Sequence, residues 1–451
     1  MNLYKHIEAR HATGKTIAVG VIGAGKFTSM FFAQAQRTPG IAITAVCDVD
    51  LGRATQNLKR AGYAAAGATP DSPVDALQQG TVWLSEDASE LIGADGVDVV
   101  VDATGDPIAG IKHVLAACDA GRHIIMVNVE ADVLAGPLLA KRAQQAGIVY
   151  SLAYGDQPAL IVELVDWAKT AGFDVVCAGK GTKYLPSYHG STPDTVWQHY
   201  GITAEAAKNA GMNPKMFNSF IDGTKSAIEM AAVANAAALS PPENGLTFPP
   251  CGRLSLAEIL KPTTAGGLLD HKGTLEVVSS LHRDGTKVME DLRWGVYVTF
   301  EGCSRYVAEC FRDYGLDTDS SGRYAALYRP YHLIGLELGV SVASVVVKNE
   351  PTGAPKGWYA DVVSVAKRDL AAGAMLDGEG GATVWGKLTT AVMSCETNAL
   401  PIGLAKQVRL RRAVSMGSLI QWADVDLDES SPEIMTRREM ERVFDPRLNR
   451  I

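Results

Sequence analysis

Three charged residues stand in a stretch that is otherwise apolar, residues 220–236, FIDGTKSAIEMAAVANA. Lys225 and Glu229 are four residues apart, so they share one face of a helix, and Asp222 suits the N-cap before the first turn. The helix has no charged side opposite its apolar one, which predicts that it is buried. A buried charge is costly unless it is paired, and buried titratable pairs are frequent in active sites. Asp222, Lys225 and Glu229 are therefore the candidate catalytic residues, with a purely structural ion pair as the alternative.

A second set of polar groups could contact a substrate. The long segment KGTKYLPSYHGSTPDTVWQHYG, residues 180–201, is rich in such side chains, and long polar segments in compact domains are often functional. Further along, YRPYHL surrounds a proline, and its arginine could hold a carboxylate or phosphate through the planar guanidinium. A solvated loop lysine, a structural arginine and a satisfied core histidine are the alternatives. The candidate substrate-binding residues are Lys183, Tyr184, His189, Arg329 and His332, with Lys180 in the same segment.

The segment TIAVGVIGAGKFTSMFFAQAQ, residues 16–36, has the pattern of a buried strand, a glycine turn and a helix. Gly23 and Gly25 allow a tight turn and let backbone N–H groups approach a pyrophosphate at the helix N-terminus, where Lys26 and Phe27 follow. Thr28 stands where the dinucleotide fingerprint has its third glycine. These residues predict a dinucleotide site.

Other candidate cofactor residues follow later strands. The strand predicted at 41–50 reaches Asp48, which would bind the ribose hydroxyls and favour NAD(H), whereas Arg53 could accept the 2′-phosphate of NADP(H). The residues alone leave the two cofactors nearly even. Ligands of such sheets bind beyond the carboxyl ends of the strands, so four more residues are expected near the nicotinamide ribose. They are Thr104, Gly105, Asn128 and Glu130, the last two with ordinary loop polar groups as the alternative.

The elements that must position these residues suggest an α/β protein with three domains. Residues 1–155 alternate strands and helices, which predicts a Rossmann domain with a doubly wound parallel sheet. Residues 156–350 are expected to form an α+β substrate and dimerisation domain with an antiparallel sheet, including strands at 274–285, 296–302 and 304–315 and a helix at 321–346. Residues 351–451 are expected to form a small all-β module. A homodimer is the expected assembly.

Composition excludes several classes of function. The net charge of −8 argues against nucleic acid or an anionic membrane as a partner. No apolar run is long enough to cross a membrane, and the polar N-terminus lacks a signal sequence. Seven scattered cysteines without a C-x-x-C pair suit a reducing cytoplasm, and the histidine spacing gives no zinc site. The expected ligand is a small phosphorylated or acidic sugar.

Several blocks together resemble the homoserine dehydrogenase-like oxidoreductases that carry a SAF module, a small all-β domain. The blocks are VIGAGKF, GKGTKYLPSYHG, DGTKSAIEMA and YRPYHL, with AKRDLAAGAMLD and AVSMGSLIQWADV for the SAF module. Within that group the chain is most similar to bacterial 1-deoxy-D-xylulose-5-phosphate reductoisomerase-like proteins. The resemblance implies isomerisation of that ketose phosphate and reduction by NADPH to 2-C-methyl-D-erythritol 4-phosphate, with divalent metal dependence left open.

The resemblance also implies roles for the candidate residues. Lys225 would be a general acid/base or oxyanion stabiliser, Glu229 and Asp222 would set its protonation, and Lys183 and Arg329 would hold the phosphate. Homoserine dehydrogenases carry the acid first and the lysine four residues later, and the inverted order here makes homoserine an unsuitable substrate. Two alternatives remain: an NAD(P)-dependent dehydrogenase of a sugar acid or hydroxy acid, and a non-catalytic dinucleotide sensor.

Overall fold

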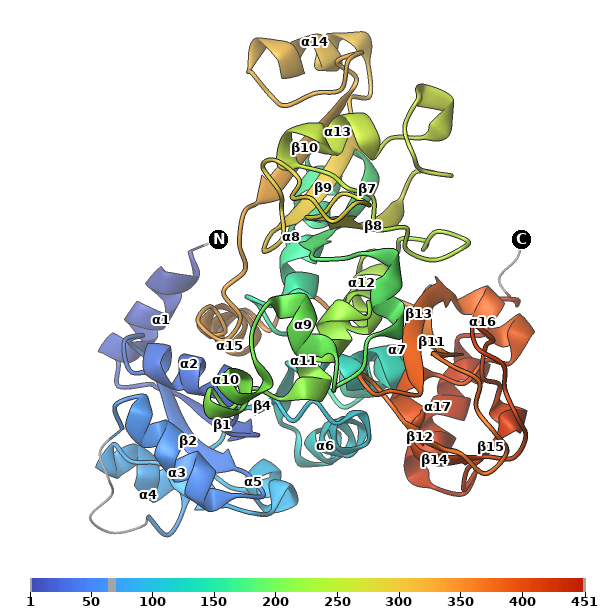
Figure 1. Cartoon of the computed structure of the whole chain (residues 1–451). Coiled ribbons are helices and arrows are strands. Elements are labelled where there is room, and N and C mark those ends of the chain that lie inside the picture. The colour runs from blue at the N-terminus through green and yellow to red at the C-terminus, as the bar shows by residue number, and fades with distance from the viewer. Residues whose placement is uncertain (1, 64–69, 449–451) are drawn as a thin grey trace. The chain divides into compact units, whose positions relative to one another are not determined.

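Strand β1 is buried at all six positions, as expected for a parallel strand covered on both faces. The computed structural model describes residues 2–63 and 70–448, and it pairs β1 in parallel with β2 and β4. The sheet order is β3-β2-β1-β4-β5-β6, which is the doubly wound order of dinucleotide-binding domains and confirms the predicted Rossmann sheet. Its strands are β1 (Ile17–Ile22), β2 (Ile41–Cys47), β3 (Trp83–Ser85), β4 (Val99–Asp102), β5 (His123–Met126) and β6 (Tyr150–Leu152). Figure 1 labels strands β1, β2 and β4 of this sheet.

Four of the helices around this sheet, α3, α5, α6 and α7, begin at side-chain caps shortly after a strand. Asp50, Asp87, Asp106 and Asn128 each accept a backbone N–H bond from the first turn of the helix that they precede. Such caps fix where each helix starts and so fix the short connections that follow the carboxyl ends of the strands. The helices are α1 (Leu3–Ala12), α2 (Lys26–Ala35), α3 (Leu51–Arg60), α4 (Pro73–Gln79), α5 (Ala88–Gly93), α6 (Pro107–Ala120) and α7 (Val129–Gln145).

The chain divides into two compact units that are discontinuous in sequence. The first combines residues 1–160 with 333–355, and the second combines 161–332 with 356–451. In the first unit the late segment supplies α15 (Gly339–Ala343) and a π-helical turn, Ser344–Lys348. Leu338, which precedes α15, and Val342 and Val345 are buried in the same core as β1. The three domains predicted at 1–155, 156–350 and 351–451 stay predictions.

The second unit contains a mixed four-stranded sheet in the order β10-β9-β7-β8. Strand β9 pairs antiparallel with both neighbours, as predicted for this region, whereas β7 and β8 run parallel. Parallel strands need a long crossover, and here helices α9 to α13 provide it. The strands are β7 (Asp174–Thr182), β8 (Thr274–Ser279), β9 (Val296–Glu301) and β10 (Tyr324–Arg329).

Two local predictions in this unit are wrong. The strand predicted at 304–315 is helix α14 (Arg305–Asp313), because Ser304 caps it by accepting the Val307 N–H, and Ala308 and Phe311 form its buried stripe. The helix predicted at 321–346 begins instead with strand β10, since β9 offers a pairing edge and Pro330 ends the strand. Only the end of that segment is helical, in α15 and the π turn.

Helices α9 to α13 and two small sheets complete the second unit. Strand β11 pairs antiparallel with β13, and β12, β14 and β15 form the other sheet. Helix α12 contacts both β11 and β13, so residues after 356 pack against the predicted catalytic helix. The helices are α8 (Gln157–Thr170), which spans the division between the units, α9 (Val196–Tyr200), α10 (Ala204–Asn209), α11 (Pro214–Ile221), α12 (Thr224–Ala237), α13 (Leu256–Ile259), α16 (Ala391–Thr397) and α17 (Pro432–Val443). The strands are β11 (Ala360–Ala366), β12 (Met375–Asp377), β13 (Val384–Thr390), β14 (Lys406–Leu410) and β15 (Val425–Asp426).

In the part of the chain that the structure describes, no helix combines the length and apolar character needed to cross a membrane.

Candidate functional site

The glycine turn after β1 leaves room for a ligand at the start of α2. Gly23 has φ +94°, and a Cβ there would lie 2.8 Å from the Ala103 carbonyl oxygen, so the position requires glycine. A Cβ at Gly25 would meet nothing within 4 Å, and no side chain caps α2. Open space beside uncapped first-turn N–H groups fits a phosphate, and Lys26 and Phe27 are the first residues of that turn. The residues of this turn therefore fit a dinucleotide.

Asp48 holds this turn in place through hydrogen bonds to its backbone. Its Oδ2 accepts the Ala24 N–H at 2.7 Å, and its Oδ1 accepts the Asp50 N–H at 2.8 Å and a guanidinium N–H of Arg53 at 2.5 Å. The carboxylate is 4% exposed, whereas the Arg53 side chain is half exposed. Arg53 thus offsets the charge that would repel a 2′-phosphate. Thr28, at the expected third glycine, is buried and donates its hydroxyl to the Gly25 carbonyl at 3.1 Å.

The remaining cofactor candidates lie where β4 and β5 end. Asn128 caps α7 and donates its side-chain amide to Thr104 Oγ1 at 3.0 Å and to the Asp106 carbonyl at 2.8 Å. Thr104 in turn donates its hydroxyl to Asp102 at 2.7 Å. Asn128 and Thr104 therefore hold the two strand ends together. Gly105 has φ +65° and open space at its Cβ position, and Glu130 is half-buried in the first turn of α7.

Helix α12 is buried, as its sequence predicts, at every position except Lys225, which is half-buried. Glu229 forms an ion pair with Lys180 of β7, and both side chains are buried. The glycines on either side of Lys180 let the backbone around it pack closely. A Cβ at Gly179 or Gly181 would lie within 2 Å of the carbonyl oxygen of Glu276 or Leu292. The structure thus joins Lys180, a candidate for substrate contact, to Glu229 of the candidate catalytic group. Its sequence signal is a lysine between two glycines in an apolar strand.

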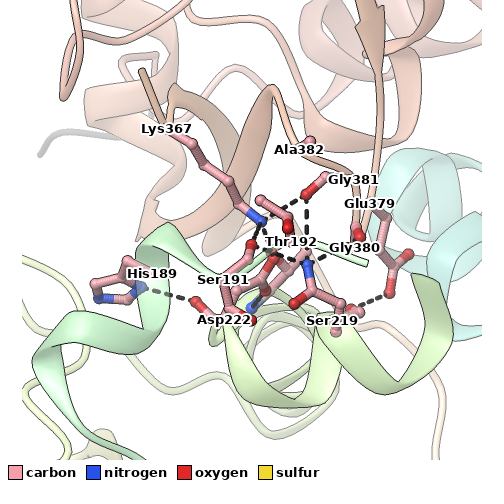
Figure 2. A network of polar contacts seen from close by, with 12 residues as sticks. His189, Ser191, Thr192, Ser219, Asp222, Lys367, Glu379, Gly380, Gly381 and Ala382 are labelled. Carbon is pink, nitrogen blue, oxygen red and sulfur yellow. Dashed lines mark hydrogen bonds and ion pairs between the residues drawn. The ribbon is translucent and has the colours of Figure 1, made fainter. Parts of the chain in front are cut away.

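Asp222 lies between α11 and α12, where it neutralises a second buried lysine. Gly223, with φ +89°, occupies the N-cap position that the sequence suggested for Asp222, while Asp222 Oδ1 accepts the Thr224 N–H at 2.9 Å. Its Oδ2 lies 2.7 Å from Nζ of Lys367, and burial raises the pKa of Asp222 against the lowering effect of this ammonium. Figure 2 shows that Lys367 also donates to the carbonyls of Ser191 and Gly381, at 2.6 and 2.7 Å.

The network around Lys367 ties α11 to the loop before β13 (Figure 2). The side-chain amide of Asn218 donates to the carbonyls of Ser191 and Gly380, at 3.0 and 2.9 Å, and the hydroxyl of Ser219 donates to Glu379 at 2.6 Å. Sequence reasoning missed Lys367, because its partner Asp222 is 145 residues away along the chain.

His189 is held in one tautomer by its two hydrogen bonds. A carbonyl oxygen can only accept, so Nδ1, 2.7 Å from the carbonyl oxygen of Asp222, carries the proton. Nε2 then accepts the hydroxyl of Tyr184 at 2.8 Å. Burial lowers the pKa of His189, and the nearby Lys367 and Lys387 lower it further, while burial raises the pKa of Tyr184 to about 12. The pair is therefore neutral at pH 7 and the Tyr184 proton points toward His189.

A cavity of about 420 Å³ lies beside this network, within the second unit. Phe248, one of its walls, has φ +51° and stacks on Tyr184 with ring centroids 3.9 Å apart. The buried carboxylate of Glu276 holds this strained residue by accepting its N–H at 3.2 Å. The residues that line the cavity are His189, Gly190, Gly223, Ala227, Asn244, Leu246, Phe248, Val365, Ala366, Lys367, Trp385, Gly386, Lys387, Leu388, Met416, Gly417 and Leu419.

Of the predicted substrate residues, only His189 lines this cavity. Lys183 donates to the carbonyl of His199, Arg329 lies at the end of β10 over the ring of Tyr331, and His332 donates Nδ1–H to the carbonyl of Trp294 at 2.8 Å. The structure therefore brings together Asp222, Tyr184 and His189, and it places the other predicted substrate residues outside the cavity lining. Within residues 2–63 and 70–448, no group of three His, Cys, Asp or Glu side chains could hold a metal ion.

One protein-family model matches the chain, and it covers the segment that contains α12. Its description is "Oxidoreductase DRL, catalytic domain", and it matches residues 155–338. The match supports an oxidoreductase. It does not test the more specific resemblances to homoserine dehydrogenases, to the reductoisomerase or to the SAF module, which stay predictions. No curated protein matches the sequence.

Solved structures show only distant similarity to the chain. A "probable dehydrogenase" from Thermotoga maritima is 13% identical over 74% of this chain and 90% of its own, with a TM-score of 0.39. The scyllo-inositol dehydrogenase of Lactobacillus casei, solved with NAD(H) and scyllo-inositol, is 14% identical over 64% and 74%, with a TM-score of 0.34. An oxidoreductase of Agrobacterium radiobacter, solved with NAD+, L-tartaric acid and magnesium, is 16% identical over 38% and 45%, with a TM-score of 0.27. This chain thus spans less than half of the last one, and similarity at these scores carries no functional argument.

Proposed function

We propose that the protein is an NADP(H)-dependent dehydrogenase of a small sugar acid or hydroxy acid. The observation that carries the proposal is the match of residues 155–338 to an oxidoreductase catalytic domain. The doubly wound sheet with an open glycine turn supports a dinucleotide cofactor. The half-buried Lys225 of α12 is the cation of this region that could contact an acidic substrate, since the buried lysines Lys180 and Lys367 are neutralised by carboxylates.

The cofactor residues support NADP(H) over NAD(H). Gly23, Gly25 and the first turn of α2 would hold the pyrophosphate, and a bound nicotinamide would supply the hydride transfer. Asp48 would be a poor partner for ribose hydroxyls, because its oxygens already accept backbone N–H groups and a guanidinium N–H of Arg53. The half-exposed guanidinium of Arg53 would bind the 2′-phosphate.

The roles that we propose for Lys225, Glu229 and Lys180 follow from how deeply each side chain is buried. Lys225 is the one residue of α12 that is not buried, so it is the residue of that helix best placed to move a proton at a substrate hydroxyl. Glu229 lies one helical turn from Lys225 on the same face of α12, and its ion pair with Lys180 holds it in place. The Lys180–Glu229 pair would therefore keep the electrostatic surroundings of Lys225 constant. The apolar body of α12 would exclude water from this region.

The test is a cofactor-reduction assay with purified protein. We expect NADP+ to be reduced when short-chain sugar acids or hydroxy acids are supplied, and NADPH to bind more tightly than NADH in a direct titration. A clear preference for NADH would contradict the cofactor assignment. Oxidation of NADPH on addition of 1-deoxy-D-xylulose 5-phosphate, without turnover of the acids, would favour the reductoisomerase. A bound cofactor that none of these substrates oxidises or reduces would favour a dinucleotide sensor.

A further inference from the structure

The cavity in the second unit carries one uncompensated positive charge. Its lining contains two lysines and no aspartate or glutamate. The ammonium of Lys367 is neutralised by Asp222 and fully hydrogen-bonded. Lys387, in contrast, has no hydrogen bond or ion pair within the described residues, and its side chain is half-buried. His189 adds no charge, since both of its ring nitrogens are engaged and its pKa is lowered by burial.

Aromatic and aliphatic side chains form the rest of the lining. Trp385 stacks on His189 with ring centroids 3.8 Å apart and an angle of 22° between the rings, and Phe248 stacks in the same way on Tyr184. The positions of these rings are fixed: Glu276 holds the backbone of Phe248, and the Gly386 N–H next to Trp385 donates to Thr224 at 2.8 Å. The aliphatic and thioether members are Val365, Leu246, Leu388, Leu419 and Met416. Such a lining is organised before a ligand arrives.

We propose that this cavity binds a small organic anion, with its carboxylate or phosphate on Lys387 and its apolar body between Trp385 and Phe248. The volume of about 420 Å³ lies within the range of small-molecule sites, roughly 300–1,000 Å³. The half-buried ammonium of Lys387 could form a charge-assisted hydrogen bond with an anionic ligand in the cavity. The proposal goes beyond the dehydrogenase function and does not depend on it, because every residue that carries it belongs to the second unit.

The experiment titrates the full-length protein with three probes of similar shape, by calorimetry and ligand-observed NMR. Benzoate carries a carboxylate, phenyl phosphate a phosphate, and benzyl alcohol no charge. We expect at least one anion to bind at least about tenfold more tightly than the alcohol, as a charge-assisted hydrogen bond would require. The stronger of the two anions identifies the head group. Failure of both anions to bind, or equal binding of the alcohol, would overturn the proposal.

Two variants of the cavity and one control variant locate the binding. Lys387→Met should weaken the anion at least about tenfold, whereas Lys208→Met, an exposed lysine of α10 outside the cavity, should leave it unchanged. Gly190→Leu should block the cavity, since a Cβ at this position meets nothing within 4 Å and so does not clash with the backbone. The circular dichroism spectrum and the thermal unfolding of each variant serve as the control for folding. Unchanged anion binding in a folded Lys387→Met protein would place the anion elsewhere and refute the assignment.

Discussion

Lys180 and Glu229 neutralise each other in the interior, where neither charge has access to bulk water. Removing one partner of such a pair leaves a buried charge and typically costs about 3–5 kcal/mol, whereas replacing both with apolar residues is often nearly neutral. We therefore expect Lys180→Met to lower the free energy of unfolding by that amount, and Lys180→Met/Glu229→Leu to regain most of it. Urea unfolding of the three proteins measures both effects. A double variant as unstable as the single one would mean that the pair is not independent of its surroundings.

Lys225 differs from these residues because its side chain is half-buried. If it transfers a proton to or from the substrate, Lys225→Ala should lower kcat by about 10²-fold or more, as loss of a general acid–base group does. The variant should stay folded, since the side chain that it removes is only half-buried. Steady-state kinetics with the substrate found in the assay, together with urea unfolding, check both statements. A folded variant with nearly normal turnover would remove Lys225 from the catalytic group.

Asp132 should make stability depend on pH. It is fully buried in α7, its Oδ1 accepts the Tyr150 hydroxyl at 2.7 Å and its Oδ2 has no hydrogen-bond partner among the described residues, so burial raises its pKa to about 7. Between its ordinary pKa of 3.8 and about 7, the folded chain keeps a proton that the unfolded chain has lost. The free energy of unfolding therefore falls as pH rises through this window, by up to about 1.4 kcal/mol per pH unit.

Asp132→Asn tests this dependence because it keeps an acceptor for Tyr150 and removes the titration. Compared with the wild type, the variant should gain stability steadily from pH 4 to pH 7, whatever the constant cost of its amide. Urea unfolding at several pH values gives the difference between the two proteins. A difference that is the same at every pH would show that Asp132 does not titrate in this range.

At the scale of elements, the turn between β1 and α2 contains two glycines with different roles. Gly23 is required for folding, and Gly25 is expected to be required for cofactor binding. Gly23→Ala adds a Cβ in a left-handed backbone conformation and 2.8 Å from the Ala103 carbonyl oxygen, so it should destabilise the protein. Gly25→Ala adds a Cβ in open space at the N-terminus of α2, so it should fold normally and bind NADPH more weakly, by about tenfold or more. Thermal unfolding and NADPH titration distinguish the two effects. Normal NADPH affinity in Gly25→Ala would place the pyrophosphate elsewhere.

The sequence predicts the elements well where several local signals agree. Strand β1 is a continuous apolar run before a glycine turn, and α12 lacks a charged side, so their type and burial could be predicted. Segments 304–315 and 321–346 were misassigned because their apolar residues fit both periodicities. The deciding interactions were the Ser304 cap of α14 and the pairing of β10 with β9, and the second of these is not visible from the segment itself.

The candidate site was predicted only in part for a related reason. Asp222, Glu229, Tyr184 and His189 stand in recognisable segments, but their partners come from elsewhere in the chain. Lys180 reaches Glu229 across 49 residues, and Lys367 reaches Asp222 across 145. Such pairs depend on how β7 and the strands after 356 pack against α12, which no local pattern records.

At the scale of the whole molecule, the first unit depends on a segment that is distant in sequence. Leu338, Val342 and Val345 from residues 333–355 are buried in its core. A fragment of residues 1–160 should therefore unfold at lower temperature and with less cooperativity than the same fragment joined by a flexible linker to 333–355, because burial of three such side chains contributes several kcal/mol. Circular dichroism melts of the two fragments make the comparison. Equal melting behaviour would show that the late segment adds nothing to the stability of that core.

The interleaving of the two units also sets an order of events during synthesis. The core of the first unit is completed only after residues 333–355 have left the ribosome, by which time much of the second unit has already emerged. The second unit then waits for its own last segment, because the buried carboxylate of Asp222 meets its ammonium only when Lys367 arrives. A chain that stops between residues 355 and 367 therefore leaves the core of the second unit unfinished and the Asp222 carboxylate without its ammonium, which would make such products recognisable to proteases and chaperones.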